Sequence, residues 1–224
     1  MRHLMSIICA VIVCISSGAP AQQRVLIPDL PELYAVTGVS PDDVLNVYEQ
    51  PTQQATIVAT LHATATRVEI TALTQDRQWG RVNVDFEPGW VSMQSMQVID
   101  MPFWWELSGQ MYCNGADPSW RAVIDGDRTG GITIIPEGRA PLSMKRGWLR
   151  DRWGRSDWGI PISAAINFEG DTIAAAAIIR AENCTDGTTP RLLGLSVHIA
   201  TSQPTSGNAS INYSYSGCCS IADH

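Results

Sequence analysis

The first residues of the chain almost lack charge. Beyond Arg2, no Asp, Glu, Lys or Arg occurs before Arg24 in this sequence of 224 residues. Residues 4–17 are apolar or small, a run shorter than the roughly 20 residues that span a bilayer, and residues 19–21 read Ala-Pro-Ala, an Ala-x-Ala cleavage site. We therefore predict a secretory signal peptide over residues 1–21. No later apolar run approaches transmembrane length, so we expect no transmembrane anchor in the mature chain.

Basic residues are also few. The chain has 15 Lys and Arg against 22 Asp and Glu, and removal of residues 1–21 takes away only Arg2 among them, which leaves 14 against 22 and a net charge of −8. A protein that binds a phosphate backbone needs cationic surface. We therefore expect no nucleic-acid partner.

Cysteine is sparse and unevenly placed. Two of the six cysteines lie within the predicted signal peptide, which leaves Cys113, Cys184, Cys218 and Cys219. An even number of cysteines in an exported chain is typical of disulfides, so we predict a periplasmic or secreted protein. No Cys-x-x-Cys pair is present, and we expect neither a metal site nor a cofactor.

The pairing of these four cysteines follows in part from their spacing. A bridge between the adjacent Cys218 and Cys219 would close a strained ring. We therefore expect Cys113 to pair with one of them and Cys184 with the other, and the sequence leaves open which. Such bridges typically stabilise a protein by roughly 2–4 kcal/mol each.

Residues 30–99 contain no cysteine and alternate short β-prone segments with turn residues. The segments are Leu33–Val36, Val44–Tyr48, Ile57–Leu61, Arg67–Ile70, Gly80–Val84 and Trp90–Met93. This pattern predicts a small all-β domain over residues 30–99. The change in composition predicts a second domain over residues 105–221.

The first domain carries a resemblance. Residues 38–51 resemble the opening strand and loop of bacterial SH3-like domains; their sequence is Gly-Val-Ser-Pro-Asp-Asp-Val-Leu-Asn-Val-Tyr-Glu-Gln-Pro. The later strand segments resemble the following strands of that family in the same order, so that the resemblance covers about residues 33–98. The resemblance implies a small SH3-like barrel, and many members of this family are targeting or binding modules of cell-wall proteins. Members usually carry Arg where this chain has Tyr48, which replaces a surface cation by an aromatic ring.

Strand alternation selects candidate ligand residues in this domain. Leu45 and Val47 share one face of their strand, and Asn46 and Tyr48 share the other. With Leu45 and Val47 in the core, Asn46 and Tyr48 lie at the surface, where we take them, together with Trp79, as candidate ligand-binding residues. The alternatives are that Trp79 is a half-buried core residue and that Tyr48 is ordinary surface.

The second half is also rich in strand patterns. They fall at Trp120–Ile124, Ile132–Ile135, Pro161–Phe168, Thr172–Ala181, Leu193–Ile199 and Ile211–Tyr215. A Glu-Gly-Asp turn at residues 169–171 predicts a hairpin, and we expect the polar residues 201–210 to form a hairpin loop. The fold class predicted for residues 105–221 is a disulfide-bridged antiparallel β-barrel or sandwich.

This half resembles a family of uncharacterised secreted bacterial domains. That family has a Cys-x-Gly-x-Glu-Pro-x-Trp opening, a Cys-x-Asp-Gly element and a final Gly-Cys-Cys. The matching segments are Cys113–Trp120, Cys184–Gly187 and Gly217–Cys219. Asp117 stands where Glu is usual and Ser119 where an aromatic residue is usual, and the family implies no reaction.

The most unusual segment is residues 145–158, which hold five cations, two anions and three tryptophans. Tryptophans spaced five apart fit neither strand nor helix periodicity, which predicts a loop or an irregular hairpin. Indole faces stack on sugar rings and arginine forks bind carboxylates. The candidate ligand-binding residues here are Trp148, Arg152, Trp153 and Trp158. The alternative is that stacking between Arg and Trp orders the loop over the core.

The junction between the two halves lacks the Gly and Ser of a flexible tether. Residues 100–106 instead carry three adjacent aromatic residues, Phe103, Trp104 and Trp105. Burial of such rings stabilises a contact between domains. We therefore expect a packed joint.

The sequence offers little for catalysis. It has no Gly-x-Ser-x-Gly elbow, His-Glu-x-x-His pair or phosphate loop. The remaining alternative is a cysteine-dependent cell-wall peptidase that uses Cys184 and His198, but Cys184 is expected in a disulfide. We therefore predict an exported cell-envelope binding protein without catalytic activity, which recognises peptidoglycan or an envelope protein. Inhibition of a cell-wall hydrolase is an alternative within the binding class.

Overall fold

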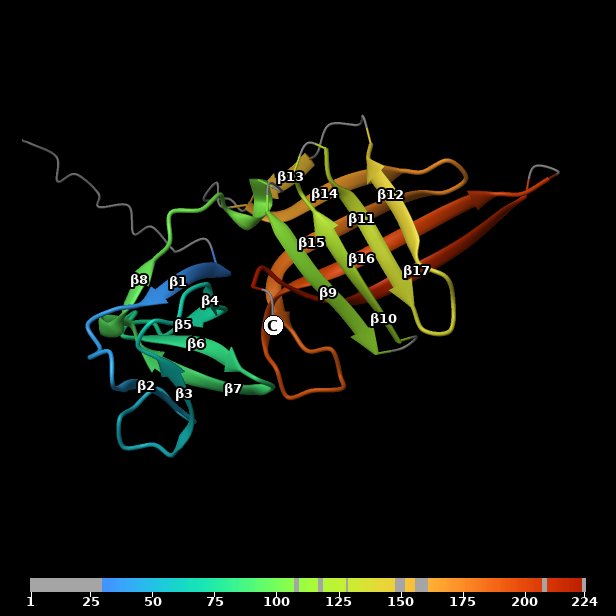
Figure 1. Cartoon of the computed structure of the whole chain (residues 1–224). Helices are drawn as coiled ribbons and strands as arrows, with labels where there is room; N and C mark the ends of the chain where they lie inside the picture. The colour runs from blue at the N-terminus through green and yellow to red at the C-terminus, as the bar shows by residue number, and fades with distance from the viewer. Residues whose placement is uncertain are drawn as a thin grey trace, which may run out of the picture.

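The protein is all-β, as the alternation predicted. A computed structural model describes residues 30–106, 109–116, 119–127, 129–147, 152–155, 161–206 and 209–222, with backbone alone at residues 152–155 and 161–162. The predicted signal peptide lies outside these residues. An N-terminal module of residues 32–98 and a barrel of residues 110–220 lie side by side (Figure 1).

Two antiparallel sheets form the N-terminal module. In the first, β1 (Glu32–Val36) lies between β4 (Val68–Ile70) and β8 (Met96–Val98). The strands of the second are β2 (Val44–Tyr48), β3 (Ile57–His62), β5 (Ala72–Leu73), β6 (Trp79–Val84) and β7 (Glu87–Ser92), in the order β3-β2-β7-β6-β5. A 3₁₀ turn, η1 (Met93–Ser95), leads from β7 to β8. All six strands predicted in residues 30–99 are therefore present.

The core of this module follows from the alternation of its strands. Val47, Ile70, Val82 and Val91 are fully buried, and Leu45 packs with them. Such a small core has little apolar area with which to offset chain entropy. The resemblance to SH3-like barrels stays a prediction.

The barrel is an antiparallel meander. Its strands are β9 (Gln110–Ala116), β10 (Ser119–Asp125), β11 (Gly131–Pro136), β12 (Leu142–Arg146), β13 (Arg152–Arg155), β14 (Pro161–Glu169), β15 (Ala174–Cys184), β16 (Leu193–Pro204) and β17 (Ser210–Ser220). Strand β17 pairs back with β9, and β12 pairs directly with β14. Eight strands, β9–β12 and β14–β17, thus close the barrel, and β13 pairs with β14 beside the closure. Of the two predicted alternatives, a barrel and a sandwich, the structure shows a closed barrel.

Side chains fill the interior of the barrel. Trp120 and Phe168 are the largest of its fully buried residues, and Ile166, Ile179 and Leu195 pack with them. An eight-stranded barrel is just wide enough to be filled in this way. The interior of the barrel is therefore a packed core, and a ligand site of the barrel would lie on its outer surface.

The structure differs from the sequence prediction in several stretches. The loop predicted at residues 201–210 is shorter, because β16 continues to Pro204 and β17 begins at Ser210. Thr201 is buried there and its hydroxyl donates to the carbonyl oxygen of Tyr213 at 3.3 Å, so a polar residue continues the inward alternation. No strand was predicted at β5, β8, β9, β12 or β13.

Polar contacts dock the N-terminal module on the loop between β15 and β16, which lies beside the end of the β6–β7 hairpin (Figure 1). Arg81, 9% exposed, donates from Nη2 to Oδ1 of Asn183 at 2.6 Å. Asn83 donates to the carbonyl oxygen of Leu192 at 3.1 Å and accepts from its N–H at 2.9 Å. The module thus completes its hydrogen bonds with atoms of the barrel.

The end of the barrel strand β17 and the linker complete the joint. Glu69, 3% exposed, accepts from the hydroxyl of Ser220 at 2.5 Å and from the N–H of Ile221 at 3.2 Å. In the 3₁₀ turn η2 (Trp104–Glu106), Trp104 is 4% exposed and belongs to the barrel core, with Trp105 packed against it. The joint is therefore packed, as the absence of Gly and Ser from the junction indicated.

No helix in the described ranges is long and apolar enough to cross a membrane.

Candidate functional site

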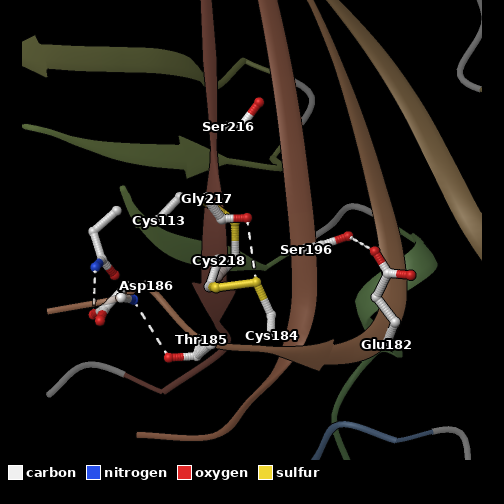
Figure 2. Close-up of a disulfide and its surroundings, with 12 residues drawn as sticks. Cys113, Glu182, Cys184, Thr185, Asp186, Ser196, Ser216, Gly217 and Cys218 are labelled. Carbon is white, nitrogen blue, oxygen red and sulfur yellow. Dashed lines mark hydrogen bonds between the residues drawn. A yellow bond between two sulfur atoms is a disulfide. The ribbon is translucent and has the colours of Figure 1, made fainter. Parts of the chain in front are cut away.

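Two disulfides join the four cysteines of the barrel. Cys113 on β9 bridges to Cys219, its direct neighbour on β17, with 4.0 Å between the Cα atoms. Cys184 at the end of β15 bridges to Cys218, and its sulfur lies 3.4 Å from the carbonyl oxygen of Gly217 (Figure 2). The prediction that residues 113 and 184 pair with the adjacent cysteines is confirmed, and the structure decides which pairs with which. The bridges indicate an oxidising, extracellular type of compartment.

Several of the residues quoted for the second resemblance meet at one place, the seam between β9 and β17. A Cβ atom on Gly115 would lie 2.4 Å from the carbonyl oxygen of Ser216, and one on Gly217 would lie 2.1 Å from that of Asn114. Trp120 uses this close approach to donate from Nε1 to Ser216 O at 3.3 Å. The glycines of both motifs are therefore explained by the spacing of the two strands.

Asp186, two residues after Cys184, organises the loop beside the seam. Its carboxylate, 1% exposed, accepts from the backbone N–H groups of Thr188 and Thr189 at 2.9 Å each and from Nδ2 of Asn114 at 2.8 Å. The hydroxyls of both threonines donate to it as well. Burial alone would raise the pKa of Asp186, but these hydrogen bonds more than offset it and hold that pKa well below its usual range.

A hollow of about 470 Å³ lies between this loop and the outer wall of β9, β10 and β11. We call it the seam groove. Its lining includes Asn114, Ser119, Arg121, Val123, Ile135, Thr188, Thr189 and Arg191. Asp186 lies in the wall formed by the loop, and Cys113, which is bridged to Cys219, lies in the wall formed by the sheet. Both sides of the groove are thus held in place.

The charges of the seam groove are uneven. Arg191 lies 3.4 Å from Asp186 and 5.3 Å above the ring of Phe86 in the N-terminal module, so its charge is neutralised and its position fixed. Arg121 is exposed, and in the part of the chain that the structure describes it has no ion pair. The groove therefore presents one uncompensated cation in a chain that is acidic overall.

The candidate residues of the N-terminal module partly converge. Tyr48 and Trp79 meet edge to face with ring centroids 5.7 Å apart, and Tyr48 lies opposite Trp90 on β7. Tyr48, Trp79 and Trp90 are half-buried, as is Asn46. We call Tyr48, Trp79 and Trp90 the aromatic cluster. The ligand roles of Tyr48, Trp79 and Asn46 stay predictions, and Trp90 is a half-buried neighbour of Tyr48.

The tryptophan-rich segment is described only in part. Trp148 and Trp158 lie outside the described residues, and the structure gives Arg152 and Trp153 a strand backbone, β13, without describing their side chains. Strand β13 pairs with β14 through a register shift at Gly154, which fits the irregular hairpin predicted there. The ligand roles of these four residues stay predictions.

The thiol–imidazole pair is absent. Cys184 has no free thiol because it is bonded to Cys218. His198 lies on the outer face of β16, where its Nδ1 is 2.8 Å from the hydroxyl of Ser216. The cysteine-dependent peptidase based on Cys184 is therefore incompatible with the oxidised protein.

The described residues contain no group of three His, Cys, Asp or Glu side chains that could hold a metal ion. Comparison of the chain with protein-family models, with curated proteins and with solved structures found no match. The seam groove and the aromatic cluster are therefore the two candidate sites in the described residues.

Sequence reasoning missed Arg121 and the groove around it. Alternation along Trp120–Ile124 was enough to place Arg121 outward, but the opposite wall comes from the loop about 65 residues later in the chain. The motif containing Asp186 was noted, whereas its hydrogen bond to Asn114 spans 72 residues and leaves no local signal.

Proposed function

We propose that this protein is an exported cell-envelope binding protein that holds a cell-wall component or an envelope protein in the seam groove. The two disulfides support export to an oxidising compartment. The predicted signal peptide and the resemblance of residues 33–98 to wall-associated modules support the periplasm and the cell wall in particular.

The observation that carries the proposal is the rigid construction of the seam groove. The disulfide Cys184–Cys218 fixes the start of the loop, and Asp186 ties that loop to Asn114 on the opposite wall. Asn83 and Phe86 of the N-terminal module hold its other end at Leu192 and Arg191. A site ordered in advance loses less entropy when a ligand binds, which favours affinity.

A co-sedimentation experiment tests this function. The mature protein is mixed with purified peptidoglycan, and in parallel passed as immobilised bait through an envelope extract. The variant Ser119→Trp places an indole in the groove at an exposed position of β10, and Ser202→Trp is the matched control on an exposed position of β16. We expect the parent and Ser202→Trp to retain the ligand and Ser119→Trp to lose it. Retention by all three, or by none, contradicts the proposal.

A further inference from the structure

We infer that the seam groove binds the free C-terminal carboxylate of an extended peptide whose last residue is apolar. This inference rests on the proposed function and names the ligand class for the same site. Its basis is the combination of one uncompensated cation, apolar neighbours on the same wall, and hydrogen-bond acceptors on that wall and on the loop opposite.

Arg121 supplies the cation. It stands in the middle of the wall, opposite Asn114 on β9 and opposite Ile135 on β11. A guanidinium binds a carboxylate through two parallel hydrogen bonds, and such bonds are stronger than those between neutral groups. Arg191 is unsuited to this role because Asp186 already holds it.

Apolar side chains flank this cation. Ile135 is 39% exposed although it lies in the middle of a sheet, and the half-buried Val123 is the next outward residue after Arg121 on β10. Cross-strand and next-outward neighbours on one face lie within reach of a single ligand residue. An apolar last side chain can therefore rest on Ile135 and Val123 while its carboxylate meets Arg121.

Hydrogen-bond acceptors lie beside this cation, on its own wall and on the loop opposite. Asn114 uses its amide N–H on Asp186, which leaves its Oδ1 as an acceptor. On the loop, Thr188 and Thr189 also direct their hydroxyl hydrogens to Asp186. The oxygen of Thr188 remains as an acceptor, whereas that of Thr189 already accepts from Nε of Arg191 at 3.3 Å. Acceptors beside a single cation suit peptide N–H groups that lead to one carboxylate, and they disfavour a ligand with many negative charges.

The experiment measures binding of fluorescein-labelled Gly-Ser-Ala-Val to the mature protein by fluorescence anisotropy. The peptide is used in two forms, with a free C-terminal acid and with a C-terminal amide. The variants are Arg121→Gln, which removes the charge, and Arg121→Lys, which keeps the charge without the fork. Arg180→Gln, at an exposed position on β15 outside the groove, is the matched control. Melting temperatures show that each variant is folded.

We expect the parent and Arg180→Gln to bind the acid at least about tenfold more tightly than the amide, a difference that one charged bidentate contact can supply. Arg121→Gln should abolish this preference, and Arg121→Lys should keep part of it. Equal binding of acid and amide by the parent, or no saturable binding at millimolar peptide, overturns the inference. Displacement of the peptide by inorganic polyphosphate at equal charge would overturn it in favour of a polyanion.

The two proposals fail differently. If the parent retains peptidoglycan or an envelope protein but shows no preference for the acid, only the carboxylate inference is wrong. If the parent prefers the acid peptide but retains neither peptidoglycan nor an envelope protein, the carboxylate site stands and the proposed function is wrong.

Discussion

Different interactions stabilise the barrel and the N-terminal module. In the described residues the barrel has a closed sheet, two disulfides and a core around Trp120 and Phe168. The module has two open sheets, no disulfide and a smaller core. It nevertheless buries three polar residues, Glu69, Thr71 and Arg81, of which Glu69 and Arg81 bond to atoms of the barrel.

This difference shows how a small module can depend on a larger neighbour. Buried polar groups cost free energy unless they are hydrogen-bonded, and here the partners of Glu69 and Arg81 belong to the barrel. Both disulfides lie at the end of the barrel that supplies these partners, because Cys184 adjoins Asn183 and Cys219 adjoins Ser220. The covalent bridges of the barrel therefore also fix the surface on which the module is docked.

The largest expected effect is the loss of the bridges. The double variant Cys113→Ala/Cys219→Ala opens a loop with a sequence separation of 106, and the barrel should lose about 5 kcal/mol of unfolding free energy. The double variant Cys184→Ala/Cys218→Ala opens a loop with a sequence separation of 34 and should lower the unfolding free energy by roughly 4 kcal/mol. Unfolding in guanidinium, followed by tryptophan fluorescence, measures the loss of unfolding free energy in both variants. An unchanged midpoint would show that the closed sheet alone carries the stability of the barrel.

Truncation of a core side chain in the module should have the next largest effect on stability. Ile70 is fully buried, and Ile70→Ala should lower the unfolding free energy of the module by about 3 kcal/mol. Ile179→Ala is the matched change in the barrel, at another fully buried isoleucine. Hydrogen exchange read by mass spectrometry should then show protection lost first in residues 32–98 for Ile70→Ala. Equal loss in both units would mean that they unfold as one.

Asp186→Asn should cost about 2 kcal/mol at pH 7, since a buried ionised acceptor of several hydrogen bonds is lost. Because the folded pKa of Asp186 is depressed, its stabilisation is complete above the unfolded carboxyl pKa of about 4 and is lost as the pH falls from there towards the folded pKa. The difference in unfolding free energy between parent and variant, measured by urea unfolding, should therefore become smaller as the pH falls from 5 to 3. A constant gap would place the effect in packing rather than ionisation.

The smallest expected effect concerns the docking itself. Asn83→Ala removes two hydrogen bonds to Leu192 and should weaken the contact between module and barrel by about 1–2 kcal/mol. The joint keeps Glu69, Arg81 and Trp104, so the two units should still tumble together. Nuclear magnetic relaxation gives the correlation time of each unit. Independent tumbling of the parent protein would show that the joint is not rigid.

Local pattern was enough to predict most strands. The alternation of Leu45 and Val47 with Asn46 and Tyr48 gave the correct core face of β2, and the pattern of Leu193–Ile199 gave that of β16. The prediction is wrong at Thr201–Pro204, because polar residues favour a loop whereas the buried hydroxyl of Thr201 finds a hydrogen-bond partner on β17. Strand β9 was missed because its inward positions include Gly115, which carries no apolar signal.

The sequence by itself determined the all-β class and the pairing of Cys113 and Cys184 with two adjacent cysteines, because hydrophobic alternation and residue spacing are local properties. The export signal stays a prediction. Only the tertiary structure decided that the second half closes into a barrel and that Cys113 forms its disulfide with Cys219 and not with Cys218. It also decided that Arg121 faces a loop that the hydrogen bonds of Asp186 hold in place. Each of these depends on strand register between segments far apart in the chain. Register is set by the packing of the whole sheet and has no signature in any one segment.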